Sequence, residues 1–337
     1  MKRSLFLPLL FLVCFVGLVA YLNRGKPRIL VLHSYATDFS WVREMNAGLE
    51  KALEGEYCAL RWFYLDTKHH PDAAFGRRIG AQARRFIDTW EPDMIISFDD
   101  NAQEYVCRYY VNDPRLRIVC GGINADPSRY GYDRADNVSG ILERLPLAAA
   151  VEFIRQVFPP ERRRLFHISD SSETSVSVGQ EFERFDWTPY RLIASRLCRT
   201  FPEWQAAVGE AENSADFILV THYHTIQRGE KDASIVPPAE VIAWTMGHSR
   251  LPALGFWAFF VEDGGALAIA LSGQEQGEVA GKIALDLLGT GGRRATPAFV
   301  SSHRFVPAFS VSRTRERDIA IPRLLEVFAA ETGHLYP

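Results

Sequence analysis

The stretch Arg28-Ile-Leu-Val-Leu32, followed by His33-Ser-Tyr-Ala-Thr-Asp-Phe-Ser-Trp41, predicts the fold of the chain. Its first part is a short apolar run rich in branched residues, typical of a strand buried on both faces of a parallel sheet. Between residues 42 and 53, apolar side chains recur at helical spacing with charges between them (Val42, Met45, Leu49 and Leu53). The stretch therefore predicts a strand, a loop and a helix.

The loop of this unit is a candidate ligand site, because open α/β sheets bind ligands at the carboxyl ends of their strands. Ser34, Tyr35, Phe39 and Trp41 bring aromatic rings and hydroxyl groups together. An alternative is that the three rings merely cover the sheet edge. Residues 33–41 contain no glycine, so neither a dinucleotide site nor a phosphate loop is expected here, and no cofactor is predicted.

Composition limits the class of protein. The 337 residues exceed one typical domain and suggest two, and the 47% hydrophobic content is enough for large cores. The 38 basic and 41 acidic side chains give a net charge of −3, which argues against a nucleic-acid partner.

The N-terminus predicts a signal peptide or a signal anchor over residues 1–26. Lys2 and Arg3 precede an uncharged stretch, residues 5–22, that would reach about 27 Å as a helix, just enough to cross the hydrocarbon of a bilayer. A cut after Ala20 would place Leu18 at −3, which is unfavourable for cleavage. We therefore expect an uncleaved N-terminal hydrophobic helix that attaches the protein to a membrane.

The cysteines indicate neither zinc nor a redox motif, because no two are spaced as C-x-x-C. For Cys58, Cys107, Cys120 and Cys198 we expect buried free thiols. A disulfide remains open if the chain is exported, and spacing alone does not decide pairing.

Strands alternate with helices through the first half of the chain. Strands are predicted at residues 58–65, 94–97, 117–120 and 137–142, and a helix at 71–90. Polar residues follow two of these strands: Asp99, Asp100 and Asn101 after one, Gly122 and Asn124 after the next. One aspartate could simply cap a helix, but two carboxylates and an amide exceed what a cap requires.

A second series begins after a helix at 145–158. It contains strands at 164–168, 190–194, 217–220 and 267–271, and helices at 176–185, 200–211, 238–247, 274–288 and 321–331. Strands alternating with helices predict parallel sheets. Two such series predict two doubly wound, Rossmann-like lobes with a central ligand cleft between them.

The motifs together resemble those of the periplasmic substrate-binding proteins of ABC transporters, in the family that includes aromatic amino-acid binders. Residues 29–41 are similar to its opening, Ser97-Phe-Asp-Asp-Asn-Ala102 and Val119-Cys-Gly-Gly-Ile-Asn124 to two strand-end loops, and residues 262–290 to its glycine turn and returning helix. The resemblance covers roughly residues 28 to 325. It departs at Ser310, where the family usually has asparagine, and in the loops of the second lobe.

The resemblance implies a type I periplasmic-binding-protein-like fold, with lobe 1 formed by residues 27–142 and about 272–295. Lobe 2 then comprises 143–271 and about 296–337. It implies an extracytoplasmic protein that captures a small-molecule ligand without turnover and delivers it to an ABC permease. The alternative is a membrane-anchored sensor acting with a separate kinase or cyclase.

The predicted ligand site combines strand-end residues of both lobes. Aromatic rings would stack on a flat or apolar ligand, and carboxylates would hold a cation; Asp100 is preferred over Asp99. An enzyme is not expected, since no hydrolase or protease motif is present, and His222 with His224 supplies only two of the ligands a metal needs. The candidates are Ser34, Tyr35, Trp41, Asp99, Asp100, Asn101, Gly122, Asn124, Ser169, Ser171, Tyr223 and Trp257.

Overall fold

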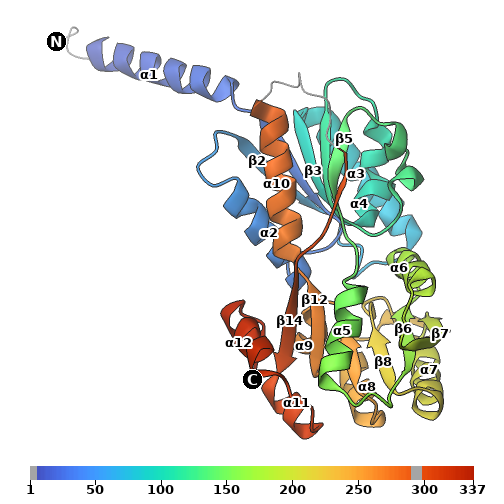
Figure 1. The fold of residues 1–337 in the computed structure, drawn as a ribbon. Coiled ribbons are helices and arrows are strands. Elements are labelled where there is room, and N and C mark those ends of the chain that lie inside the picture. The colour runs from blue at the N-terminus through green and yellow to red at the C-terminus, as the bar shows by residue number, and fades with distance from the viewer. Residues whose placement is uncertain (1–5, 290–297) are drawn as a thin grey trace.

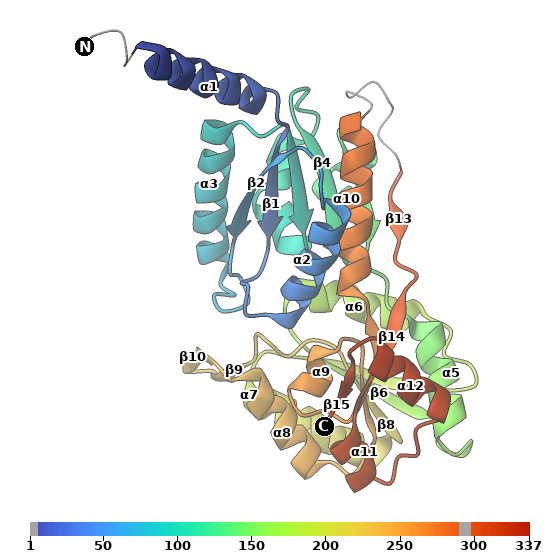
Figure 2. The same ribbon diagram turned by 90° about the vertical axis from the view of Figure 1, so that its left-hand side faces the viewer.

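The computed structural model describes residues 6–289 and 298–337, which form two α/β lobes stacked one on the other (Figures 1 and 2). The first lobe holds β1 (Arg28–His33), α2 (Ser40–Ala52), β2 (Ala59–Tyr64), α3 (Ala73–Trp90), β3 (Met94–Phe98), α4 (Asp100–Tyr105), β4 (Arg117–Ile123), β5 (Val138–Leu142), α10 (Gly273–Gly289) and β13 (Val300–Ser301). The second holds α5 (Leu147–Val157), β6 (Arg164–Asp170), α6 (Glu173–Arg184), β7 (Arg191–Cys198), α7 (Phe201–Ser214), β8 (Phe217–Val220), β9 (Gln227–Gly229), β10 (Asp232–Ile235), α8 (Pro238–His248), β11 (Ala253–Gly255), α9 (Phe259–Glu262), β12 (Leu267–Leu271), β14 (Phe305–Ser310), α11 (Val311–Glu316), α12 (Arg323–Glu331) and β15 (Leu335–Tyr336).

The first sheet has the order β13-β5-β4-β3-β1-β2, and every neighbouring pair is parallel. Alternate residues of β1 enter separate cores: Ile29 and Val31 face α2 and α10, while Leu30 and Leu32 face α3. Helices thus cover both faces (Figure 2). This confirms the doubly wound lobe that the near-continuous apolar strands predict.

The second sheet has the order β15-β14-β12-β11-β8-β6-β7. Its strands are parallel except for β12 and β14, which run antiparallel. The core strands of each lobe follow the same winding, with the chain's second strand at one edge and its third on the other side of the first. Each lobe therefore has a topological switch point, the place where open sheets bind ligands.

Three segments connect the lobes: one between β5 and α5, one between β12 and α10, and one between β13 and β14. Ser302 and Arg144 tie two of them together, because the Ser302 hydroxyl accepts from the Arg144 amide at 3.0 Å and donates to its carbonyl at 3.1 Å. The Glu275 carboxylate accepts from the amides of His303 and Arg304 at 2.9–3.2 Å. The pairing of β13 with β5 places Val300 with the first sheet, although the sequence analysis assigned it to lobe 2.

Helices α2 and α10 lie side by side because glycines remove side chains from their contact (Figure 1). A Cβ on Gly277 would overlap the carbonyl oxygen of Met45, and one on Gly48 would overlap that of Gln274. Backbone atoms cannot yield as a flexible side chain can. The returning helix α10 is thereby fixed against the first lobe.

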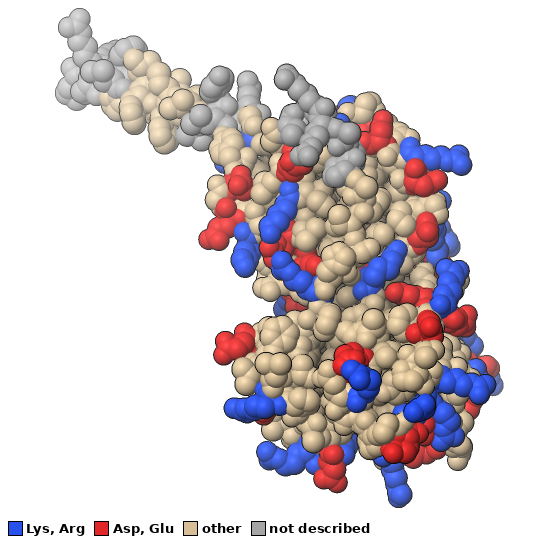
Figure 3. All heavy atoms as spheres, in the orientation of Figure 1, with Lys and Arg blue, Asp and Glu red and all other residues tan. Residues whose placement is uncertain are grey.

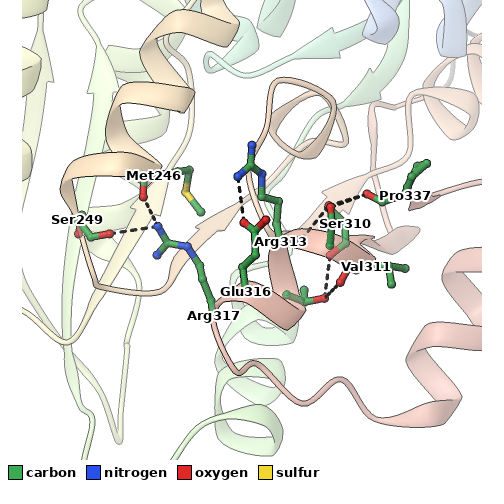
Figure 4. A network of polar contacts seen from close by, with 10 residues as sticks. Met246, Ser249, Ser310, Val311, Arg313, Glu316, Arg317 and Pro337 are labelled. Carbon is green, nitrogen blue, oxygen red and sulfur yellow. Dashed lines mark hydrogen bonds and ion pairs between the residues drawn. The ribbon is translucent and has the colours of Figure 1, made fainter.

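The C-terminus is held against β14 and α11 (Figure 4). The hydroxyls of Ser310 and Ser312 donate to the carbonyl oxygen of Pro337 at 2.9 and 3.0 Å. The Arg317 guanidinium donates to the carbonyls of Met246 and Ser249, which joins α11 to the end of α8. Ser310, where the resemblance expects asparagine, thus helps to anchor the end of the chain.

Helix α1 (Phe6–Arg24) projects away from the first lobe (Figures 1 and 2). In the part of the chain that the structure describes, no helix is both long and apolar enough to cross a membrane. The anchor expected over residues 1–26 includes residues outside the described part of the chain and stays a prediction from the sequence.

Several features were not predicted from sequence. The hairpin β9–β10 replaces an expected loop, and α9, α11 and β15 are short elements without a strong periodic pattern. The described cysteines are free thiols, as expected, although Cys58 is partly exposed rather than buried.

Candidate site between the lobes

The switch points of the two sheets face each other. Tyr35 and Asp99 follow β1 and β3 in the first lobe; Asp170 is the last residue of β6 in the second lobe, and His222 follows β8. All four side chains are buried. The ring of Phe39, in the first lobe, lies 4.8 Å from that of His224 in the second. The strand ends of both lobes therefore meet in one polar junction.

Asp99 is a buried carboxyl group that is only partly hydrogen bonded. It is 2% exposed, and its Oδ1 accepts from Nε1 of Trp41 at 2.9 Å. Its Oδ2 has no hydrogen-bond partner among the described residues. Burial, reinforced by the neighbouring Asp100 against the opposing effect of Trp41, raises the pKa of Asp99 to about 8.

The backbone around Asp99 is unusual. Asp99 has a φ of 65°, and Gly122 opposite has a φ of 67°. A Cβ on Gly122 would approach Oδ1 of Asp99. Gly122, predicted as a site residue, thus makes room for the carboxyl group rather than offering a side chain of its own.

Asp100, which the sequence analysis preferred, is fully engaged within the first lobe. Its oxygens accept from the amides of Asn124 and Ala125 at 3.2 and 3.1 Å, and from the Tyr130 hydroxyl at 2.9 Å. Burial raises its pKa, and these donors oppose that rise. The contacts indicate that Asp100 holds the loop after β4 in place, whereas Asp99 keeps one oxygen without a partner among the described residues.

Glu143 lies where the chain first leaves the first lobe, and its carboxyl group accepts hydrogen bonds from both lobes. Its Oε1 accepts from Nε1 of Trp257 at 2.9 Å, and its Oε2 from Nδ2 of Asn124 at 3.0 Å. It is 2% exposed. Burial, together with Asp99 and Asp100, raises its pKa well above the usual range. Three acidic groups therefore share one poorly solvated region.

Further polar atoms of this junction lack partners among the described residues, and they include Oδ1 of Asn124 and Nδ1 of His222. The His222 ring lies 4.4 Å from that of Trp257, which in turn binds Glu143. Burial lowers the pKa of His222 to about 3, so the ring is neutral near pH 7. The unpartnered atoms thus belong to one contiguous cluster that spans both lobes.

Lys68, which follows β2, faces Asp170 in the second lobe. Burial lowers the pKa of Lys68, and the carboxylates led by Asp170 oppose this. For Asp170, burial is outweighed by Lys68, by His222 and by serine hydroxyl donors, so its pKa lies below the usual range. Asp170 accepts from the amides of Ser172 and Thr225 at 3.1 Å. Asp170 is therefore ionised at neutral pH.

Two cavities open at the junction on either side of Lys68 and His69. The larger one, of about 520 Å³, is here called cavity A; the smaller, of about 260 Å³, is cavity B. Both are lined by residues of the two lobes. The visible face of the molecule narrows between the lobes and carries interspersed positive and negative side chains (Figure 3). Cavity A is lined by Tyr35, Thr67, Lys68, Asn101, Ser171, Thr174, Arg199 and Thr225 among others.

Only some of the predicted residues line cavity A, namely Tyr35, Asn101 and Ser171. Ser34 and Ser169 are buried in backbone contacts: Ser34 donates to the Phe98 carbonyl at 2.7 Å, and Ser169 accepts from the His222 amide at 3.2 Å. Tyr223 donates to Asp263 at 2.7 Å. Trp41 and Trp257 direct their indole N–H groups at carboxyl groups. These residues shape the site rather than present free surface.

Sequence reasoning did not select Lys68, Glu143 or Asp170 for this cluster, and it weighed His222 only as a metal ligand. Lys68 and Asp170 lie at carboxyl ends of predicted strands, so the positional rule covers them. Glu143 follows the apolar run Val138–Leu142 directly, at the expected crossing. In the described part of the chain, no group of three or more His, Cys, Asp or Glu residues is placed to hold a metal ion.

Comparison with known proteins gives matches at the level of structure. No family model matches the chain, and no curated protein matches its sequence. Solved structures match over nearly the whole chain. An ABC domain in complex with L-Trp from Streptococcus pneumoniae has a TM-score of 0.67 at 16% identity, covering 90% of this chain and 98% of that one. The fold is that of the periplasmic solute-binding proteins.

Two other matches have the same fold. The ligand-free, open structure of a substrate binding protein with adhesive properties from Clostridium difficile has a TM-score of 0.64 at 14% identity, covering 88% of this chain and 96% of that one. An ABC transporter solute binding protein from Agrobacterium vitis, bound with α-D-tagatopyranose, has a TM-score of 0.59 at 12% identity, covering 93% and 100%. At such identities the likeness shows the fold alone.

Proposed function

We propose that the protein captures a small solute between its two lobes and binds it without turnover. The observation that carries this proposal is the set of unpartnered polar atoms at the junction: Oδ2 of Asp99, Oδ1 of Asn124 and Nδ1 of His222. A buried polar group without a hydrogen bond costs about 1–3 kcal/mol. A solute that supplied the missing partners would offset that cost and favour the closed arrangement of the lobes.

The acidic cluster favours a solute with a positively charged, hydrogen-bond-donating group. Asp99 and Glu143 have raised pKa values because burial and mutual repulsion disfavour their charged forms. A cation next to Asp99 would relieve both effects. A charge-assisted hydrogen bond to Asp99 would also be stronger than one to a neutral group.

Location and partner follow from the same proposal. We propose that the protein captures its solute outside the cytoplasm and delivers it to a membrane permease of the ABC type. Lys2 and Arg3 followed by an uncharged apolar stretch in the sequence support export. Co-purification in the presence of the solute would name the partner and would separate delivery to a permease from reporting to a sensor kinase.

A thermal-shift screen of the purified full-length chain tests solute capture. The panel contains amino acids, amines, sugars and nucleosides. A solute at 100 times its dissociation constant should stabilise the protein by about 2.7 kcal/mol. Asp99→Asn should abolish the stabilisation, while Asp133→Asn, which changes an exposed carboxylate that pairs only with its neighbour Arg134 at 3.5 Å, should retain it. Chemical conversion of the stabilising solute would contradict binding without turnover.

A further inference from the structure

Lys68 is a buried residue whose ammonium group makes no hydrogen bond within the described residues. It is 8% exposed, and no ion pair joins its Nζ to a carboxylate in that part of the chain. The ammonium group lies over the face of the Tyr35 ring in a cation–π contact, and the ring centroid is 4.8 Å from Nζ. An ammonium group has three donors, and a ring face does not replace them.

Asp170 makes no hydrogen bond to Lys68 within the described residues, although the two opposite charges attract each other across the junction. The oxygens of Asp170 are taken up by its own lobe: Oδ1 accepts from Ser172 and Ser175, and Oδ2 from the Thr225 amide. The effect of Asp170 on Lys68 is thus electrostatic, and it leaves the N–H donors of Lys68 available. The other carboxyl groups around Lys68 also have donors within the protein: Asp99 and Glu143 accept from indole N–H groups, and Asp100 accepts from two backbone amides and a tyrosine hydroxyl.

Cavity A brings further free donors next to Lys68. Ser171 and Thr225, both from the second lobe, line it, and neither hydroxyl makes a hydrogen bond within the described residues. Lys68 comes from the first lobe. The cavity, of about 520 Å³, therefore brings the Lys68 ammonium of one lobe together with the hydroxyls of Ser171 and Thr225 of the other.

The remaining charged residues at cavity A are already occupied. Glu173 pairs with Arg129 of the first lobe, and Arg199 lies 3.8 Å from Glu230. The carboxylate of Asp72 accepts from the Phe75 amide at 2.8 Å. Among these charged groups, Lys68 is the one whose donors point to no protein partner.

We propose that cavity A receives a carboxylate group of the solute, with Lys68 as its principal anchor and the hydroxyls of Ser171 and Thr225 as additional donors. This inference rests on the proposed function and deepens it by naming a second chemical group of the solute. A single negative charge fits better than a dianion, because Asp170 already lies near Lys68 and would repel further charge. Since the donors come from both lobes, the carboxylate would also hold the lobes together.

The test uses each solute that stabilises the full-length protein and the matched compound in which the carboxylate is replaced by a primary amide, beginning with L-tryptophan and L-tryptophanamide. Isothermal titration calorimetry measures both dissociation constants for the wild type, Lys68→Met and Lys68→Arg. The acid should bind the wild type at least about 10-fold more tightly than the amide. Lys68→Met should remove that preference, and Lys68→Arg should keep part of it.

Lys282→Met is the matched control, because Lys282 is an exposed lysine whose ammonium pairs with Glu278 on α10. It should leave the preference for the acid unchanged. Equal binding of acid and amide by the wild type, or an unchanged preference in Lys68→Met, would overturn this inference while leaving solute capture intact. If no acid, amide or other compound of the wider panel stabilises the wild type, the proposed function fails and the inference with it.

Discussion

The indole Nε1 of Trp257, in the second lobe, donates a 2.9 Å hydrogen bond to Oε1 of Glu143, at the point where the chain leaves the first lobe. Both residues are buried. The contact joins the segment after β11 in the second lobe to a connection between the lobes. Movement of the lobes relative to each other would therefore have to change this contact or carry Glu143 with it.

Replacing Trp257 with Phe should weaken both stability and solute binding. The ring stays, but Glu143 loses a donor, which costs about 1–3 kcal/mol in a buried site. Chemical denaturation and calorimetry measure the two effects. Trp204→Phe is the control. The Trp204 indole on α7 donates a 2.9 Å hydrogen bond to the hydroxyl of Thr245 on α8. It should lower stability in the same range while the dissociation constant of the solute stays within about 2-fold.

Asp99 and Asp100 should respond oppositely to replacement by Asn. Asp100→Asn weakens acceptors for two amides and the Tyr130 hydroxyl, so the free energy of unfolding should fall by about 1–3 kcal/mol. Asp99→Asn should keep or raise stability and lose the solute. Denaturant melts and calorimetry of both variants check this. Unchanged solute binding by a folded Asp99→Asn protein would remove Asp99 from the site.

Stability should fall as pH rises from about 6.5 to 8. The folded-state pKa of Asp99, about 8, lies above its unfolded value of 3.8, so the folded state holds the extra proton between these limits. The contribution is present at low pH and is lost as pH rises through 8, by up to about 1.4 kcal/mol per unit. His33, His167 and His222, with pKa values of about 3, act with the opposite sign, but only below their unfolded value of 6.5.

Denaturant melts at pH 6.5, 7.25 and 8 measure this slope in the wild type and in Asp99→Asn. The variant should show a flatter dependence, and the difference between the two isolates Asp99 from Glu143, whose raised pKa acts in the same direction. Parallel curves for the two proteins would show that Asp99 is already ionised in this range.

Gly277→Ala should destabilise the first lobe by about 1–3 kcal/mol, because its new methyl group would overlap the backbone of Met45 in α2. Gly209→Ala is the control on α7, where the added Cβ would meet no atom within 4 Å. It should stabilise the protein by about 0.5–1 kcal/mol through helix propensity alone. Thermal or denaturant unfolding distinguishes the two signs.

Much of the fold could be predicted from local patterns. The apolar runs Phe217–Val220 and Leu267–Leu271 match strands β8 and β12 residue for residue, because a fully buried strand leaves an unbroken apolar signature. The hairpin Gln227–Ile235 was missed, since its strands are short, exposed and polar. Such an element is fixed by tertiary contact and not by its own pattern.

The site could be predicted by position but not by role. Strand ends identified Asp99 and Asp100, but only the three-dimensional contacts show that Asp100 serves the loop after β4 while Asp99 keeps a free oxygen. Lys68 and Glu143 were missed because their importance depends on the opposite lobe. Neither Asp170 near Lys68 nor Trp257 near Glu143 is close in sequence.

Hydrogen–deuterium exchange with and without the stabilising solute tests solute capture between the lobes most directly. Protection should appear together in the segment after β3, at Asp99 to Gln103, and in the segment after β8, at His222 to Thr225, with little change at α11. Protection in both lobes at these strand ends is the predicted result. Protection confined to one lobe, or none at either segment, would contradict the account.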